Sequence, residues 1–159
     1  MSIFLPKNTS QIKIFRGSES PFIRGNYTKS GEPTSQSSQH WAEQARYDLE
    51  SARAMLNSGR YLSVLSCCQQ AVEKMLKAII SERSQELPPR IHHLARLAEA
   101  AAVEMSDDQL DFLRELSAYY IQTRYPEEIP DLASLAKEDE ARRVMNQTEE
   151  IVQWLNSIL

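Results

Sequence analysis

Two long apolar stripes of helical spacing, joined by a very short break, restrict the fold of this chain more than any other feature. The first stripe begins near Ser38, the second reaches about Arg83, and Ser58-Gly59-Arg60 separates them. The apolar positions recur three or four residues apart, as on one face of a helix. They are Trp41, Ala45, Leu49, Ala52 and Leu56, then Leu62, Leu65, Cys68, Val72, Met75, Leu76 and Ile79. Because so short a connection favours antiparallel neighbours, the sequence predicts a helical hairpin, with Ser37 or Ser38 as N-cap and Gly59 after the first helix.

Further helices are predicted after a proline break. Leu87-Pro88-Pro89 interrupts the chain, and a short helix follows from about His93 to Ala101. Ser106 and Gln109 then have the spacing of a capping box at the start of a fourth helix. The stripes of the fourth and last helices are Leu110, Leu113, Leu116 and Tyr120, then Ala141, Val144, Thr148, Ile151, Leu155 and Ile158. We therefore expect an all-α fold, an up-and-down helical bundle of four main helices plus one short helix.

Residues 1–38 differ in composition from the rest of the chain. They hold three of the four glycines and the Ser/Thr-rich end EPTSQSSQ, and they carry more basic than acidic side chains. This composition favours an extended or disordered basic leader over residues 1–38 and one helical domain over residues 39–159. No apolar run approaches the roughly 20 residues of a membrane span, and no secretory signal is recognisable. We therefore expect a cytoplasmic protein that makes no use of a membrane.

The charge and the motifs exclude several classes of function. The chain has a net charge of −4, and because residues 1–38 are basic, the negative charge lies in residues 39–159. An acidic domain repels polyanions at long range. Non-specific duplex binding is thereby excluded, and any nucleotide or RNA site must be local. The chain has no Gly-rich phosphate loop and no nucleophile elbow.

Cysteine and histidine spacing predicts no metal and no cofactor. Cys67 and Cys68 are the only cysteines, and they lack the companion spacings of a zinc site, so we expect them to be reduced and packed. His92 and His93 precede a short apolar helix without a third ligand at a recognisable spacing. The alternatives for His92 and His93 are metal ligands or acid–base groups, but without that third ligand a capping or surface role is favoured for both.

Residues of opposite charge share a polar stripe on the second predicted helix. Glu73 and Lys77 are four positions apart, with Lys74 beside them, so that Glu73 and Lys77 lie on one face. The periodicity favours a solvated helix face with a weak ion pair. The alternative is that Lys74 and Lys77 belong to a local phosphate site.

The stretch YYIQTRYPEEIPD ends the fourth predicted helix on Arg124-Tyr125-Pro126. One interpretation is simple termination, because proline cannot continue a helix and a cation is stabilised at its carboxyl end. The alternative is a phosphate site, because the guanidinium of Arg124 is a planar, permanently charged fork. Tyr119, Tyr120 and Tyr125 would then offer stacking surfaces for a base.

The chain from His40 to Leu159 resembles the HEPN domain in its short stand-alone form. The resemblance rests on the joint order of HWAEQARYDLESARAML, RYLSVLSCCQQAVEKMLKAII, IHHLARL and YYIQTRYPEEIPD. It implies a homodimer whose facing subunits build a cleft, often encoded beside a minimal nucleotidyltransferase in a toxin–antitoxin pair. Many HEPN proteins are metal-independent ribonucleases, whose motif is an arginine, usually a polar residue next, and a histidine a few residues later.

This sequence departs from the ribonuclease motif. Arg124 matches the arginine, but Tyr125 replaces the polar residue and no histidine follows anywhere in the chain. Attack by a ribose 2′-hydroxyl needs a base, and an arginine stays protonated. Glu128 and Asp131 lie in the right direction, yet carboxylates ionised at neutral pH would repel the phosphate.

Three functions remain open. The first is a HEPN partner of a minimal nucleotidyltransferase that binds nucleotide or RNA phosphate in a dimer cleft. Its predicted binding residues are Arg124, Lys74, Lys77, Glu73, Tyr120 and Tyr125. The second is an atypical metal-independent ribonuclease toxin in which Arg124 is the tentative catalytic residue. The third is a non-catalytic dimeric interaction subunit.

Overall fold

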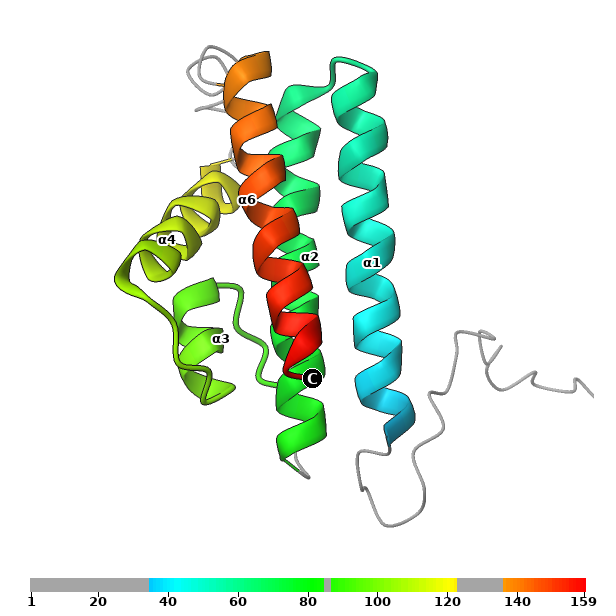
Figure 1. Ribbon diagram of the computed structural model, residues 1–159, viewed down its shortest axis with the longest axis vertical. Helices are drawn as coiled ribbons and strands as arrows, with labels where there is room; N and C mark the ends of the chain where they lie inside the picture. Colours follow the sequence, from blue (N-terminus) through cyan, green and yellow to red (C-terminus); the bar gives the residue numbers. More distant parts are fainter. Residues whose placement is uncertain (1–34, 85–86, 123–135) are drawn as a thin grey trace, which may run out of the picture.

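The computed structural model describes residues 35–84, 87–122 and 136–159, which form five helices and no strand (Figure 1). The helices are α1 (Ser35–Asn57), α2 (Tyr61–Arg83), α3 (Leu94–Ala100), α4 (Asp107–Gln122) and α6 (Glu138–Ser157). The predicted all-α bundle with one short helix is therefore confirmed. No helix in these ranges combines the length and the apolar character that crossing a bilayer requires.

The predicted hairpin is formed by α1 and α2, which run in opposite directions (Figure 1). Gly59 lies between them with a φ of +69°, a left-handed conformation that glycine adopts without a steric cost. The start of α1 differs from the prediction. Because nothing between Pro33 and Ser38 interrupts a helix, α1 begins at Ser35, and Ser37 and Ser38 lie in its first turns instead of capping it.

Helix α2 occupies the centre of the bundle and contacts each of the other described helices. Figure 1 shows α6 beside α2, with α1 on one side and α3 and α4 on the other. The apolar side chains of α2 that are fully buried are Val64, Leu65, Cys68, Ala71, Val72, Met75, Leu76, Ala78 and Ile79. Because neighbours surround α2, it also buries polar side chains, among them Gln69, Glu73 and Lys77.

Hydrogen bonds cap the start of α4 and the end of α3. Ser106 and Gln109 form the predicted capping box: the Ser106 N–H donates to Gln109 Oε1 at 2.9 Å, and the Gln109 N–H donates to Ser106 Oγ at 3.3 Å. At the end of α3, Arg83 Nη1 donates to the carbonyl oxygens of Ala101 and Ala102 at 2.8 and 2.9 Å. These bonds satisfy carbonyls that a helix end leaves without an intrahelical partner.

The adjacent cysteines are free thiols, and Cys68 packs in the core. Its Sγ lies 3.8 Å from Met145 Sδ of α6. Burial raises the pKa of the Cys68 thiol to about 12. Cys68 is therefore a packing residue without thiolate character at neutral pH.

Candidate functional site

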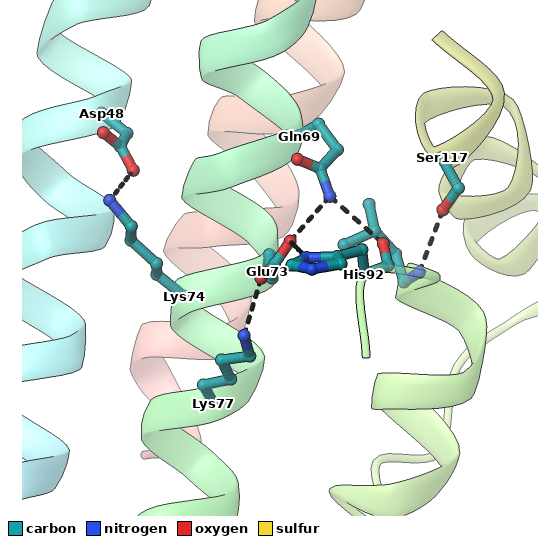
Figure 2. A network of polar contacts seen from close by, with 8 residues as sticks. Asp48, Gln69, Glu73, Lys74, Lys77, His92 and Ser117 are labelled. Atoms are coloured by element: carbon teal, nitrogen blue, oxygen red, sulfur yellow. Dashed lines mark hydrogen bonds and ion pairs between the residues drawn. The ribbon is translucent and has the colours of Figure 1, made fainter. Parts of the chain in front are cut away.

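A buried carboxylate on α2, Glu73, collects polar contacts from its own helix and from the segment before α3. Its Oε1 accepts a hydrogen bond from Lys77 Nζ at 2.7 Å, and its Oε2 accepts one from Gln69 Nε2 at 2.9 Å. His92 Nδ1 lies 3.1 Å from Oε1 and 3.2 Å from Oε2 (Figure 2). Because Glu73 is only 8% exposed, these groups take the place of most of the water that an exposed carboxylate would bind.

Burial and hydrogen bonding act on Glu73 in opposite directions. Burial by itself raises the pKa of this carboxyl, because it removes water from the charged form. The hydrogen bonds from Lys77, Gln69 and His92 favour the charged form, and together they hold the pKa of Glu73 below its ordinary value. Glu73 is therefore ionised at neutral pH and acts only as a hydrogen-bond acceptor.

His92 is fixed at both its backbone and its ring. Its carbonyl oxygen accepts a hydrogen bond from Gln69 Nε2 at 3.2 Å. Two residues later, the Leu94 N–H donates to Ser117 Oγ at 2.9 Å, which ties the start of α3 to α4. The His92 ring lies against Tyr120 of α4, with 5.5 Å between ring centroids and 36° between planes. About half of the imidazole side chain, 51%, remains exposed.

The interpretation of Glu73 and Lys77 as a solvated helix face is wrong. Both residues are 8% exposed, because Trp41 of α1 and the His92 segment lie against them. Lys77 Nζ is 5.4 Å from the centroid of the Trp41 ring and lies over the ring, the arrangement of a cation–π contact. The ammonium of Lys77 is thus held between a carboxylate and an indole.

Lys74 lies apart from this group. Its Nζ is 2.5 Å from Asp48 Oδ2 on α1, and Figure 2 shows the pair on the α1 side of α2, away from His92. Of the two lysines predicted for a phosphate site, the structure therefore brings only Lys77 to Glu73. Each ammonium already has a carboxylate partner within the chain.

Through its contact with His92, Tyr120 places the last turn of α4 beside Glu73. Its neighbour Tyr119 is directed elsewhere, with its hydroxyl donating to Glu140 of α6 at 2.7 Å. Arg124 and Tyr125 lie outside the described residues, because the description stops after Gln122 at the end of α4 and resumes at residue 136. Their part in a phosphate site stays a prediction, whereas His92 contacts both Tyr120 and Glu73, and Glu73 binds Lys77.

Sequence reasoning missed two residues of this group. Gln69 stands four positions before Glu73, so helical spacing could have placed its amide on the same face. His92 is 19 positions from Glu73 and reaches it across a bend in the chain, and no local pattern signals such a contact. His92 is exposed, as a surface role predicts, and the structure adds that its ring contacts a buried carboxylate.

We call Gln69, Glu73, Lys77, His92 and Tyr120 the Glu73 cluster. Since the carboxylate takes the Nδ1 side of the imidazole, the opposite nitrogen, Nε2, has no hydrogen-bond partner among the described residues. An imidazole oriented in this way can accept or donate a proton at Nε2. Nowhere in the described ranges do three His, Cys, Asp or Glu side chains gather as they would around a metal ion.

A hollow elsewhere on the surface fits a phosphate poorly. It has a volume of about 430 Å³ and lies between α4 and α6, with Phe112, Ile151 and Trp154 among its lining residues. Its charged lining residues are Asp108 and Glu150, both acidic. Because these carboxylates repel anions, the Glu73 cluster is the better candidate site.

Comparisons with known proteins agree with this architecture. The family model described as the HEPN domain matches residues 38–158. The crystal structure of TT1696 from Thermus thermophilus is similar at 28% identity, with a TM-score of 0.66, over 77% of this chain and 98% of that one. ST0689, described as an archaeal HEPN homologue, is similar at 25% identity, with a TM-score of 0.60, over 76% of this chain and 95% of that one. No curated protein matches the chain.

Proposed function

Because this chain belongs to the HEPN domain family, we propose that it is the HEPN partner of a minimal nucleotidyltransferase in a toxin–antitoxin-like module. In this proposal, the chain forms a homodimer and binds nucleotide or RNA phosphate in the cleft between its two subunits. The proposed contacts come from Arg124, with support from the Glu73 cluster.

The observation that supports the proposal most is the position of Tyr120. This residue packs on His92 beside the buried Glu73–Lys77 pair, and the sequence continues from α4 to Arg124 within four residues. A largely buried polar group, of which the His92 ring is half-exposed, therefore lies against the last turn of the described part of α4. Aromatic rings and a guanidinium are the groups that commonly hold a base and a phosphate.

The ion pairs of Lys74 and Lys77 bear on which cation would bind a phosphate. Lys77 is bonded to Glu73 and Lys74 to Asp48, so a phosphate would have to compete with a carboxylate for either lysine. Arg124 is therefore assigned the main phosphate contact, and the two lysines and Tyr125 a supporting part. With a net charge of −4 on the chain, this attraction must be local.

Binding of a fluorescently labelled single-stranded RNA, followed by anisotropy with ATP as competitor, tests the phosphate site. Arg124→Ala should weaken binding by about 10- to 100-fold, because a hydrogen bond to a charged group contributes about 1.5–3 kcal/mol. Arg53→Ala is the matched control, since Arg53 pairs with Glu149 on the α1–α6 surface. Equal affinities for wild type and Arg124→Ala would remove Arg124 from the site.

The nucleotidyltransferase partnership has its own test. We expect the protein encoded by a neighbouring gene, if it is a minimal nucleotidyltransferase, to co-purify with this chain and to relieve any growth arrest that this chain causes. Co-expression with an unrelated nucleotidyltransferase is the control. Absence of both co-purification and relief would contradict the toxin–antitoxin part of the proposal.

A non-catalytic dimeric interaction subunit is the second candidate. It is favoured by the pairing of Lys74 with Asp48 and of Lys77 with Glu73 inside the chain, because a ligand would have to compete with these carboxylates for either lysine. This candidate predicts a stable dimer that binds neither RNA nor ATP in the anisotropy experiment.

A further inference from the structure

The hollow between α4 and α6 lies apart from the Glu73 cluster and differs from it in chemistry. In the second half of α4, the Tyr119 hydroxyl donates to Glu140 of α6 at 2.7 Å, and Glu115 pairs with Arg143. The hollow lies nearer the start of α4, which is inclined to α6 (Figure 1). Its volume of about 430 Å³ falls within the range of about 300–1,000 Å³ that is usual for small-molecule sites.

The lining of this hollow combines aromatic rings with carboxylates. Phe112 and Ile151 are buried, and the indole of Trp154 is partly buried. Asp108 of α4 and Glu150 of α6 are exposed, so that each helix contributes one carboxylate. We propose that the hollow binds an aliphatic diamine or polyamine, whose ammonium groups contact the carboxylates and whose methylene chain covers the apolar residues. This site goes beyond the proposed function and does not depend on the phosphate site.

The two carboxylates have no cation of the chain close to them. Other acids of these helices pair with an arginine three or four positions away, namely Asp111, Glu138 and Glu140. No basic residue stands three or four positions from Asp108 or from Glu150, and neither forms an ion pair within residues 35–84, 87–122 and 136–159. Their uncompensated charges favour a cation that comes from outside the chain.

Helix geometry explains one of these acids but not the other. Asp108 stands in the first turn of α4, where the helix dipole stabilises a negative charge. Glu150 stands in the body of α6, beyond the reach of that effect. Glu150 is therefore the acid whose replacement tests the site most directly.

The protein already binds one ammonium with the same pair of groups. Lys77 Nζ lies 2.7 Å from Glu73 Oε1 and 5.4 Å from the centroid of the Trp41 ring, so that a carboxylate and an indole hold one cation. In the hollow, Glu150 and Trp154 are four positions apart on α6 and hence share a face. Since no described lining residue is basic, the cation for this second pair would belong to a ligand.

Helix α4 repeats this spacing on its side of the hollow. Asp108 precedes Phe112 by four positions, as Glu150 precedes Trp154. Each helix thus presents one carboxylate and one aromatic ring to the same space. Two such pairs match a ligand with an ammonium group at each end, and the apolar lining favours a hydrocarbon chain between the ends over a hydrated metal ion.

Isothermal titration calorimetry of the full chain with 1,5-diaminopentane tests the site at low ionic strength, where exposed charges attract most strongly. We expect saturable binding of the diamine and none of 1,5-pentanediol, which has the same carbon chain without the charges. Nα-acetyl-lysine methylamide carries a single ammonium and represents a lysine of a partner protein. It should bind about 5-fold more weakly, the effect of one exposed ion pair, and equal affinity would overturn the assignment to a diamine.

Two neighbouring glutamates separate a local contact from overall charge. Glu150→Gln should weaken diamine binding by about 5-fold. Glu149→Gln is the matched control, because it removes the same charge at the next residue, which pairs with Arg53 of α1. Equal weakening in the two variants would show that the diamine responds only to net charge, and it would overturn the site.

Trp154→Leu tests the aromatic part of the site, because leucine is apolar but has no ring. Affinity for the diamine should fall by about 2- to 5-fold, the effect of an exposed cation–π contact, and unchanged affinity would refute the contact. If this variant fails to fold in a thermal melt, Glu150→Gln at its exposed position still decides. Wild type without saturable diamine binding would refute the site and leave the proposed phosphate site standing, since RNA binding is measured separately.

Discussion

At the scale of single residues, the Glu73–Lys77 ion pair differs from an ordinary surface ion pair because both side chains are buried. Two charges lose most of their water at 8% exposure, and the attraction between buried ions roughly offsets that loss. The pair therefore adds little net stability, whereas the loss of one partner leaves a buried charge without compensation. Its structural effect is to fix the carboxylate that contacts the His92 ring.

The pH dependence of stability follows from the lowered pKa of Glu73. A carboxyl whose pKa is lower in the folded state stabilises the fold above its ordinary value, and this contribution is lost as the pH falls through the folded pKa. The stability advantage of wild type over Glu73→Gln should therefore be constant near neutral pH and shrink as the pH falls below 4.5, the ordinary value. Urea unfolding of both proteins across this range measures it.

The comparison with Glu73→Gln removes the background of other carboxyls. Glu140 also has a lowered pKa, chiefly through its hydrogen bond with Arg143, but it is present in both proteins and cancels in the difference. An advantage that grows as the pH falls would contradict the direction of the Glu73 shift.

The sequence predicts which side chains take part in the candidate site but not how deeply they are buried. The sequence predicts Glu73, Lys77 and Tyr120 as candidate binding residues, because charge and helical spacing are local properties; the structure places them in one cluster, and their role in binding stays a prediction. The burial of Glu73 and Lys77 was not, because a polar pair four positions apart has the same pattern on a solvated face. The contact with His92 depends on the path of the chain between α2 and α3, which no spacing rule describes.

At the scale of elements, α3 ends under strain. Ala102 follows it with a φ of +50°, a left-handed conformation in which a Cβ atom costs about 1 kcal/mol. Arg83 of α2 bonds the carbonyls of Ala101 and Ala102. The end of α3, the shortest of the described helices, is thus held by α2.

Replacement of Ala102 by glycine should relieve this strain. We expect Ala102→Gly to raise the free energy of unfolding by about 0.5–1 kcal/mol, because glycine adopts positive φ without the steric cost. Ala100→Gly is the control: Ala100 is exposed but helical, so this change should lower stability by up to about 1 kcal/mol. Urea unfolding measures both, and a loss of stability in Ala102→Gly would contradict the strain.

Most elements were predictable because their signals are local. The stripes around Ser58-Gly59-Arg60 gave the hairpin, and Ser106 with Gln109 gave the start of α4. Helix α1 begins at Ser35, before the serines that the sequence predicts as caps, because the end of a helix is less sharply encoded than the helix itself. Apolar spacing and capping residues therefore predict the type of an element better than its first and last residues.

At the scale of the whole molecule, charge and architecture limit how an anion can be bound. The chain carries a net charge of −4, and α2 directs its lysines toward carboxylates on α1 and on itself. Within the part of the chain that the structure describes, neither Lys74 nor Lys77 therefore offers an unpaired positive charge to an anion. Two copies that face each other would double the local contribution of Arg124.

The proposed dimer predicts a measurable mass. Sedimentation equilibrium at micromolar concentration should give twice the mass of one chain for wild type and for Arg124→Ala, since dimerisation does not depend on the phosphate contact. Wild type that remains a monomer at every concentration would contradict a cleft built from two subunits.

The contact between Lys77 and Trp41 has a practical consequence. An indole is sensitive to the electric field of a nearby ammonium, and here the ammonium is bonded directly to Glu73. Trp41 is therefore an intrinsic fluorophore two contacts away from His92, and in a Trp154→Phe background it would be the only tryptophan in the chain. Changes in emission could then report on events at the imidazole without an attached dye.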